Sequence, residues 1–469
     1  MKRDLDALTR RTFDVLVIGG GIYGLTLAYD AAQRGLSVAL VERNDFGSGT
    51  SFNHLRTLHG GLRYLQTLDL SRARESVRER RTLAVIAPDA VRPLQFVLPL
   101  GSSLMRGPLA MTLGFALDAV VARDRNDGVP DSHRLPRGRV VGDTAVWYDY
   151  EAVEADRLTF AFAVAAAAHG AVLANHVEAT ALLFDGPRVT GASIGDVESG
   201  RTLEVAARET VNATGGAIAG LLPPDGRAAG ARVPMLKAMN LVTRREAGDT
   251  AQGGITAAGR TVFMVPWRGR ALFGTWESPV LCDPEDTRVS EADVARFIAE
   301  LNEAYPALRL VREDVAVVHR GIVPAIVRGA RVGLAAQEQV VHGNGLTSVA
   351  GAKYTTARAV AERLVDGLMV RLGQPAVTCR TATTPLPGRG VPPATGDPLV
   401  WAAREEMART LADAVIRRTG MGSLGFPGAE ALGRAASIVG AELGWSEERR
   451  QSEIAAVTRF YDYDVRLRT

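Results

Sequence analysis

Residues 14–42, DVLVIGGGIYGLTLAYDAAQRGLSVALVE, set the architecture of the first part of the chain. The run before the glycines is apolar apart from Asp14, which is typical of a strand buried on both faces. The stretch continues as a helical pattern over residues 25–34 and closes with a second apolar strand over residues 37–41. This order predicts a βαβ unit with two parallel strands.

The glycines of this stretch predict a dinucleotide site. Gly19, Gly21 and Gly24 match the G-x-G-x-x-G pattern, which allows a tight turn and lets a pyrophosphate approach the backbone at a helix N-terminus. Glu42 ends the second strand, where its carboxylate can accept hydrogen bonds from ribose hydroxyls. The pattern alone does not distinguish FAD from NAD.

Two later glycine turns favour a flavin. They are ATGG at residues 213–216 and SVAGAKYTT at residues 348–356. A single-domain NAD protein needs neither, whereas a flavin protein assembled from separated segments needs both. One turn would close over the dinucleotide, and the other would direct a helix N-terminus at the N1–C2 end of the isoalloxazine, where reduction places negative charge. The sequence therefore predicts FAD.

The composition fits a packed enzyme of two or three domains. The chain has 469 residues, of which 46% are hydrophobic and 23% charged. Its 55 basic and 52 acidic residues leave a charge of only +3, and no basic stripe with interleaved aromatics indicates a nucleic-acid partner. Cys282 and Cys379 have no CxxC spacing, so we expect no metal site and a cytoplasmic location.

Several blocks of sequence spread along the chain carry a family resemblance. They are LHGGLRYL at 58–65, VNATGG at 211–216, VPWRGRALFGT at 265–275, VAGAKYTTARAVAERLVD at 349–366 and AELGWSEERR at 441–450. With these blocks the chain resembles the FAD-dependent glycerol-3-phosphate dehydrogenase family. The resemblance implies an α/β fold with a discontinuous Rossmann-like FAD-binding domain of the D-amino-acid-oxidase type. It also implies a substrate domain with a mixed antiparallel sheet, a C-terminal helical domain, and hydride transfer from carbon to flavin N5.

On this resemblance we expect an FAD-binding domain from residues 12–95, 155–220 and 315–372, and a substrate domain from residues 96–154 and 221–314. The proline- and glycine-rich residues 373–398 predict a linker. Residues 399–469 would form the helical domain, with helices over residues 401–418 and 429–443 and from residue 447 onward.

Oxidation of an alcohol needs a group near its hydroxyl proton and cations or donors that orient the substrate. Lys353 follows the second glycine turn and matches the family's active-site lysine; the alternative is a solvated lysine at a helix start. His59 is either a proton acceptor or a histidine that packs against the cofactor. Lys237 matches another family lysine, with a substrate-contacting or a structural role. Glu277 could meet a hydroxyl or an amine of the substrate.

The sequence departs from the family at the expected substrate site. Asn240 stands where the family has a histidine, Val323 stands where it has an arginine, and the basic residue expected near residues 335–337 is missing. Asparagine cannot act as a general base at neutral pH, and valine cannot bind phosphate. Arg320 or Arg328 would have to compensate. We therefore expect a substrate other than glycerol 3-phosphate.

His54 is a further departure, since the family usually has a small hydroxyl residue there. It either hydrogen-bonds near a non-covalent FAD or carries the flavin covalently. The full set of predicted cofactor contacts is Gly19, Gly21, Gly24, Glu42, Arg43, Thr50, Ser51, His54, Gly61, Leu62, Val177, Thr214, Gly215, Gly351, Lys353, Tyr354 and Thr355.

These observations predict an FAD-dependent oxidoreductase acting on a C–OH, or a C–NH, of a small polar molecule, with oxygen or quinone as electron acceptor. Two alternatives stay open: an orthodox glycerol-3-phosphate dehydrogenase that reduces quinone, and a non-catalytic flavin-binding subunit. Residues 107–122 are apolar apart from Asp118, and arginines flank them. This segment is either an interfacial helix that contacts the inner face of a membrane or a core helix.

Overall fold

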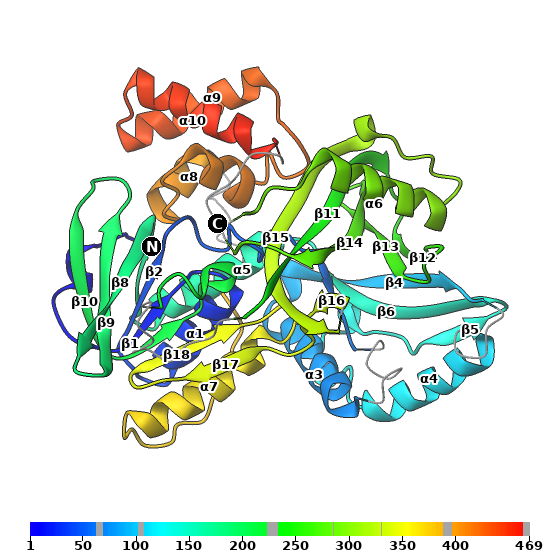
Figure 1. The fold of residues 1–469 in the computed structure, drawn as a ribbon, viewed down its shortest axis with the longest axis horizontal. Helices are drawn as coiled ribbons and strands as arrows, with labels where there is room; N and C mark the ends of the chain where they lie inside the picture. The colour runs from blue at the N-terminus through cyan, green and yellow to red at the C-terminus, as the bar shows by residue number, and fades with distance from the viewer. Residues whose placement is uncertain are drawn as a thin grey trace.

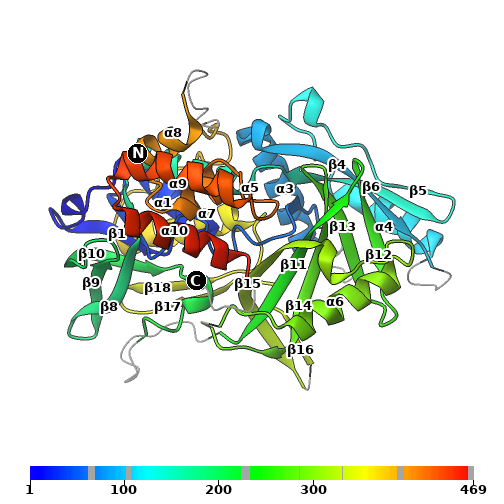
Figure 2. The same ribbon diagram turned by 90° about the horizontal axis from the view of Figure 1, so that it is seen from above.

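The computed structural model describes residues 1–61, 69–101, 107–222, 233–284, 286–329, 331–387 and 396–462. Two sheets lie next to each other, and the C-terminal helices stack above the first sheet (Figures 1 and 2). The predicted cofactor contact Leu62 and parts of the predicted linker and C-terminal domain lie outside the described residues.

The first sheet is built around the predicted βαβ unit. Strands β1, β2, β7, β10 and β18 are mutually parallel, in the order β18-β10-β1-β2-β7, and β17 adds an antiparallel edge. A hairpin of β8 and β9 continues antiparallel from β10. The bounds are β1 (Phe13–Ile18), β2 (Val38–Glu42), β7 (Val172–Asn175), β8 (Val177–Asp185), β9 (Arg188–Asp196), β10 (Thr202–Asn212), β17 (Gln339–His342) and β18 (Leu346–Ala350).

Both faces of this sheet are covered, which explains the continuous apolar strands. Helices α1 (Ile22–Gln33), α5 (Ala155–Ala168) and α7 (Ala357–Arg371) pack on one face, where Val15, Val17, Val38 and Leu40 are buried. The alternate residues Leu16, Ile18, Ala39 and Val41 pack with the β8–β9 hairpin on the other face.

The second sheet is almost wholly antiparallel. Its order is β16-β15-β11-β14-β13-β12-β4-β6-β3, with β5 paired to β6 and only β12 and β4 parallel. The bounds are β3 (Thr57–Leu58), β4 (Val91–Pro99), β5 (Arg139–Val141), β6 (Thr144–Ala152), β11 (Met235–Glu246), β12 (Thr250–Ile255), β13 (Thr261–Trp267), β14 (Arg270–Leu281), β15 (Val315–Arg328) and β16 (Arg331–Leu334). Helix α6 (Glu291–Ala304) packs its apolar side on this sheet, and α3 (Leu70–Ile86) and α4 (Pro108–Val121) lie at its other end (Figure 1).

The C-terminal helices are α8 (Pro398–Glu405), a π-helix at Asp413–Arg418, α9 (Ala429–Leu443) and α10 (Glu447–Phe460). Ser446 caps α10 as its position predicts, because its side chain accepts a hydrogen bond from the Arg449 N–H. Short 3-10 helices occur at Asp6–Leu8, Pro88–Ala90, Asp131–His133, Gly215–Ala217 and Arg312–Asp314.

Two expectations differ from the structure. Residues 91–95, 315–328 and 331–334, assigned above to the FAD-binding domain, form strands of the second sheet, because β15 pairs with β11 and then with β16, and β4 pairs with β6. The helix expected over residues 401–418 is interrupted after Glu405, where Met407 has a left-handed φ of +53°. No helix in the described part of the chain is long and apolar enough to span a bilayer.

Candidate functional site

A cavity of about 480 Å³ lies where the two sheets meet. Its wall is formed by the turn between β1 and α1, the loop after β2, the end of β10, strand β15 and the turn between β18 and α7. The carboxyl ends of the parallel strands β1, β2, β10 and β18 therefore open into it, which is where doubly wound sheets bind their ligands. In the described residues no group of acidic, histidine and cysteine side chains could hold a metal ion.

The glycine turn leaves no room for side chains. A Cβ on Gly24 would lie 1.9 Å from the Gly19 carbonyl oxygen, and a Cβ on Gly19 would lie 2.6 Å from the Ala213 oxygen. Gly19 also has a φ of +108°, which favours glycine. Bare backbone thus forms the floor of the cavity beside a helix N-terminus, and this cradle fits the pyrophosphate of FAD.

Glu42 is fixed at the end of β2. Its Oε2 accepts a hydrogen bond from the Gly20 N–H (2.6 Å) and its Oε1 accepts one from the Asn44 N–H (2.8 Å). Burial raises the pKa of Glu42, although both backbone donors act in the opposite direction. The carboxylate lines the cavity in a set position, which suits it to a ribose.

The loop at Thr50 and Ser51 joins the cofactor side of the cavity to the second sheet. The Ser51 hydroxyl accepts a hydrogen bond from the Ile22 N–H (2.9 Å), an amide of the first turn of α1. The Thr50 hydroxyl donates to the Ile322 carbonyl on β15 (3.0 Å). Both residues line the cavity, together with the predicted contacts Arg43, Val177, Thr214 and Gly215.

The turn between β18 and α7 forms another wall. The Tyr23 hydroxyl donates to the Lys353 carbonyl (3.1 Å), and a Cβ on Gly351 would lie 2.0 Å from that hydroxyl. The Tyr354 hydroxyl shares a hydrogen bond with Thr159 (2.8 Å). These contacts anchor the backbone on both sides of Lys353, which lines the cavity with Gly351 and Tyr354.

His54 lines the cavity and has a ring nitrogen that is buried without a partner among the described residues. Its ring stacks on Tyr354 with centroids 4.7 Å apart, and its Nδ1 accepts a hydrogen bond from the Arg56 backbone N–H (3.1 Å). Burial, with the nearby charges of Arg56 and His59, holds the pKa of His54 well below its usual range. The ring is therefore neutral with its proton on Nε2, and Nε2 is buried with no hydrogen-bond partner among the described residues.

Four of the five predicted catalytic residues do not line the cavity. Asn240 is only 2% exposed: its amide donates to the Asn53 carbonyl (3.1 Å) and accepts from the Thr275 hydroxyl (2.9 Å). Lys237 pairs with Asp286 (3.0 Å) and also donates to the Arg288 carbonyl (2.7 Å).

His59 and Glu277 also lie elsewhere. His59 is about half exposed and its Nδ1 lies 3.3 Å from Asp149, a carboxylate that also pairs with Arg80. Glu277 stands opposite Ala238 in the ladder between β14 and β11. Of the predicted cofactor contacts, Gly24, Gly61 and Thr355 are not part of the cavity wall.

Val323 belongs to an apolar cluster beside the cavity. It is 5% exposed and packs with Leu236 and Ala325, and the partly buried residues Ala238, Val332, Leu334 and Ala352 complete the cluster. Val323 itself is not part of the cavity wall, and the cluster reaches the wall through Ala352, which lies in the turn before α7.

Sequence reasoning missed several residues of the wall. Asn53 lines the cavity and its Oδ1 accepts a hydrogen bond from the Arg320 N–H (3.2 Å). Arg320, considered above only as a compensating arginine, also lines it, whereas Arg328 lies at the exposed end of β15. Phe460 enters from the end of α10, and no local signal in the sequence indicates that contact.

Comparison with known proteins agrees with this geometry. Residues 14–366 match the model of a family described as FAD dependent oxidoreductase, and residues 381–450 match the C-terminal domain of alpha-glycerophosphate oxidase. A glycerol-3-phosphate dehydrogenase of Synechocystis sp. is 30% identical over 418 residues, which cover 82% of this chain and 75% of that protein. Glycerol-3-phosphate dehydrogenase 2 of Mycobacterium tuberculosis is 34% identical over 371 residues, covering 76% of this chain and 62% of that protein.

Solved structures show the same fold. The glycerol-3-phosphate dehydrogenase of Bacillus halodurans, solved in complex with FAD, superposes with a TM-score of 0.75 at 22% identity, covering 98% of this chain and 96% of that one. L-proline dehydrogenase of P. horikoshii superposes with a TM-score of 0.56 at 16% identity, covering 79% of this chain and 96% of that one.

Proposed function

The chain belongs to the glycerol-3-phosphate dehydrogenase family of FAD-dependent oxidoreductases, and from this premise we propose that it oxidises a small molecule other than glycerol 3-phosphate. The bond oxidised is a C–OH or a C–NH. The observation that carries the proposal is Val323, buried in an apolar cluster at the position where the family resemblance implies an arginine.

The charge of glycerol 3-phosphate opposes its binding here. A phosphate dianion loses its hydration on entering a pocket and needs charge-assisted, preferably bidentate, partners in return. The apolar cluster of Val323, Leu236 and Ala325 lies behind the wall and, among the described residues, reaches the cavity only through Ala352, so it offers no donor there. Asn240 cannot take up a proton, and Asn53 and Thr275 already occupy its amide. We therefore assign the pocket to a less charged substrate with an apolar portion.

The contacts described above support FAD as the cofactor that the family uses. FAD, when bound, supplies a two-electron acceptor for the oxidation. We assign the pyrophosphate to the bare backbone at Gly19 and Gly21, and the ribose to Glu42. We also propose that FAD is bound non-covalently, because the Arg56 N–H occupies Nδ1 of His54 and leaves the proton on Nε2, so that neither nitrogen presents a lone pair for a covalent bond.

Two residues of the wall suit the substrate oxygen. The ammonium of Lys353 would stabilise negative charge that develops on this oxygen as its proton passes to water in the cavity. His54 would donate a hydrogen bond from Nε2 once a movement of its ring exposes this buried nitrogen to the cavity, where the substrate oxygen would supply the partner that it lacks in the described structure. Neither role needs a side chain to change its charge state on binding.

The orthodox alternative has one observation in its favour, because Arg320 lines the cavity. Its Nη2, however, donates to the Asp462 carbonyl (3.0 Å), and its backbone N–H is held by Asn53. The contact of Nη2 directs this end of the guanidinium toward the C-terminal segment, which leaves less of it for a substrate phosphate.

We further propose that α4 makes a peripheral contact with a membrane, where a quinone would be the electron acceptor; oxygen is the acceptor if the contact is absent. Leu109, Leu113 and Val120 are 69%, 64% and 70% exposed and share one side of the helix. An exposed apolar stripe of this kind suits the interface of a bilayer.

The double variant Val323→Arg with Asn240→His tests the substrate assignment. It should gain flavin reduction by glycerol 3-phosphate under anaerobic conditions, relative to the parent protein. Val327→Arg with Asn240→His is the matched control, since Val327 lies on the same strand but is exposed and belongs neither to the cavity wall nor to the apolar cluster around Val323. An FAD-loaded Val323→Arg, Asn240→His variant that gains nothing would show that these two positions do not exclude the phosphate.

A further inference from the structure

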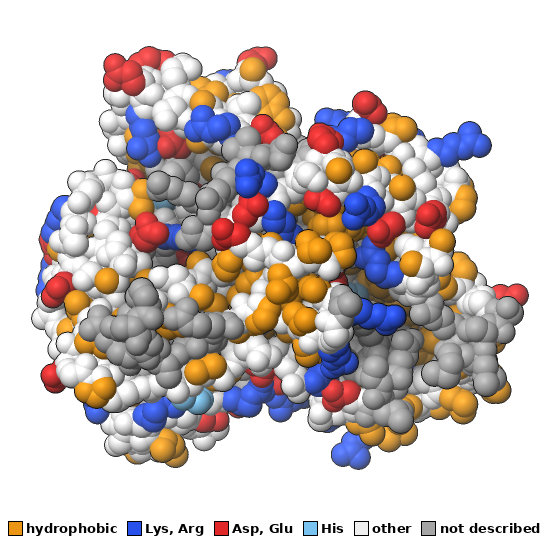
Figure 3. Space-filling view, viewed as in Figure 1, with side chains coloured by type: hydrophobic (Ala, Val, Ile, Leu, Met, Phe, Trp, Pro, Cys, Tyr) orange, Lys and Arg blue, Asp and Glu red, His pale blue; other side chains and the backbone are white. Residues whose placement is uncertain are grey.

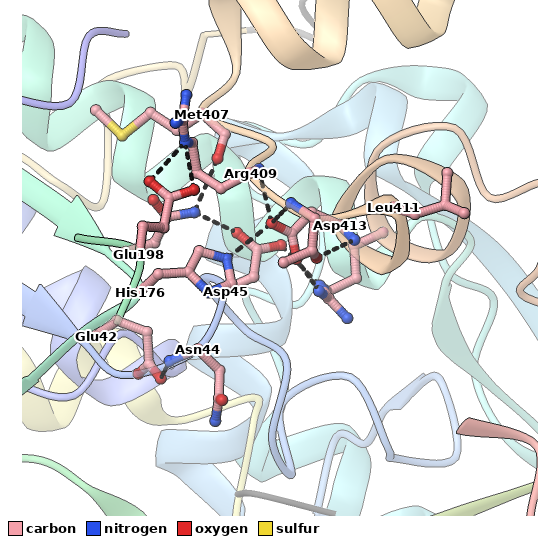
Figure 4. A network of polar contacts seen from close by, with 12 residues as sticks. Glu42, Asn44, Asp45, His176, Glu198, Met407, Arg409, Leu411 and Asp413 are labelled. Carbon is pink, nitrogen blue, oxygen red and sulfur yellow. Dashed lines mark hydrogen bonds and ion pairs between the residues drawn. The ribbon is translucent and has the colours of Figure 1, made fainter. Parts of the chain in front are cut away.

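A buried network of charges joins the C-terminal helices to the loop that carries Glu42. Its centre is Asp45, which Figure 4 shows near His176 and Asp413; it is completely buried and accepts four hydrogen bonds. Arg418 donates two of them, from Nη1 and Nη2 (both 2.7 Å), Arg417 donates one from Nε (2.7 Å), and Asn175 donates one from its side chain (3.0 Å). Arg417 and Arg418 come from the π-helix, and Asp45 follows Glu42 by three residues.

A second connection runs through His176. Its Nε2 lies 2.8 Å from Asp413 of the same π-helix, and its backbone N–H donates to the Asn44 carbonyl (2.8 Å). His176 has a φ of +54°, which L side chains rarely adopt, so these contacts hold it in a conformation that it would not keep alone. The next residue, Val177, lines the cavity, as do Glu42, Arg43 and Asn44.

The π-helix is itself tightly fixed. The Asp413 carboxylate accepts hydrogen bonds from the backbone N–H groups of Arg409 (2.9 Å) and Thr410 (3.0 Å). The Arg418 guanidinium donates to the Glu406 carbonyl and lies 4.1 Å from the centre of the Phe160 ring on α5. The network thus touches the first sheet, its helices and the C-terminal helices at one place.

Buried ion pairs are an inefficient source of stability, because desolvation offsets much of their attraction. Their strict geometry instead fixes the relative positions of the groups they join. Here, the ion pairs join the π-helix to the loop that contains Asp45 and to His176. Neighbours of these two residues form the ribose end of the cavity.

We propose that the C-terminal helical region is part of the cofactor-binding machinery, and that Asp45, His176, Asp413, Arg417 and Arg418 position the ribose end of the FAD site. FAD binding and the docking of the C-terminal helices on the first sheet are then coupled, and each favours the other to the same extent. The inference rests on the FAD site alone and is independent of the identity of the substrate.

Arg418→Met and Asp45→Asn test the coupling. Each should raise the dissociation constant of FAD by about 10-fold, within the usual range of coupling between sites. The readout is the quenching of flavin fluorescence when FAD is titrated into apo protein that circular dichroism shows to be folded. Arg409→Met is the matched control: its side chain pairs with exposed Glu198 at the same interface (3.0 Å) but does not touch Asp45 or His176.

Because the coupling is reciprocal, FAD binding should also stabilise the docking of the C-terminal helices. Protection of these helices from proteolysis by FAD is therefore a second readout, which a merely structural role would not change. In the parent protein, FAD should slow proteolytic cleavage within residues 396–462, and in Arg418→Met this protection should be lost. If Arg418→Met does not fold, His176→Gln replaces it, with a smaller rise in the dissociation constant expected. Affinities within twofold of the parent in folded variants, or an equal loss in Arg409→Met, would overturn the proposal.

Discussion

Glu42 has the best-defined position of the residues assigned to FAD. Two backbone hydrogen bonds, of 2.6 and 2.8 Å, fix its carboxylate before a ligand binds. We expect Glu42→Ala to weaken FAD binding by about 1.5–3 kcal/mol, the usual value of hydrogen bonds to a charged group. Titration of FAD into the apo protein measures this loss, with the nearly isosteric Glu42→Gln as the control for shape. Unchanged affinity in Glu42→Ala would show that the ribose lies elsewhere.

Lys353 is the one predicted catalytic residue that lines the cavity. Lys353→Met keeps much of the side-chain shape and removes the charge, so it should slow flavin reduction by the substrate about 10²-fold, as loss of a single electrostatic donor does elsewhere. Stopped-flow absorbance under anaerobic conditions measures the rate, and Lys353→Arg tests whether charge alone suffices. A reductive rate in Lys353→Met equal to that of the parent would assign Lys353 to structure.

Asn240 illustrates what sequence reasoning predicts about a residue and what it does not. Its chemistry follows from its identity, since an amide is no base. The position of Asn240 in the structure does not follow from its identity. Its side chain contacts Asn53 and Thr275 and lies outside the cavity wall. Lys237 likewise pairs with Asp286, which is distant in sequence.

Local sequence patterns predict helices and strands correctly where residues that are neighbours in sequence are also neighbours in space. The βαβ unit at residues 14–42 has the predicted strands and helix within one to three residues. The expected FAD-binding domain includes residues 315–328, whereas β15 belongs to the second sheet. Nothing in its sequence shows that it pairs with β11. The break after α8 was also missed, since the polar contacts that hold the π-helix come from the distant Asp45 and His176.

The contact between His176 and the π-helix makes stability depend on pH. Burial disfavours the charged imidazole, but Asp413 and Asp45 raise its pKa above the usual 6.5 against the opposing charge of Arg417. Arg3 also faces the residue, through a hydrogen bond to its carbonyl (3.4 Å).

The stabilisation is therefore complete below the unfolded-state pKa of His176 and is lost as pH rises through the higher folded-state value. We expect the free energy of unfolding to fall in the range from about pH 6.5 upward, as measured by urea titration, and the fall to be smaller in His176→Gln. Equal pH profiles for the two proteins would show that His176 does not titrate with folding.

Helix α4 carries the proposed membrane contact. Leu113→Glu replaces an exposed leucine, and because burial of a leucine contributes about 1.5–3 kcal/mol, it should reduce binding to lipid vesicles by roughly 10-fold or more. Co-sedimentation with anionic vesicles measures the effect. Val370→Glu on α7, which is 79% exposed, is the control, and equal binding by parent and Leu113→Glu would remove α4 as the contact.

At the scale of the whole molecule, the cavity is formed by segments that are far apart in the chain. The fingerprint at Gly19, Gly21 and Gly24 predicts its floor, because one local turn suffices. The wall formed by Asn53, Arg320 and Phe460 exists only where the second sheet and α10 pack against the first sheet. No spacing in the sequence predicts that packing. The apolar surroundings of Val323 likewise come from β11 and β16.

The choice of substrate can be measured directly on the parent enzyme. The FAD-loaded protein is mixed with glycerol 3-phosphate under anaerobic conditions, and the flavin absorbance is followed, alongside a panel of uncharged alcohols and amines of similar size. We expect little or no bleaching by glycerol 3-phosphate and faster bleaching by an uncharged member of the panel. Rapid and complete bleaching by micromolar glycerol 3-phosphate would contradict this expectation and identify the protein as an orthodox glycerol-3-phosphate dehydrogenase.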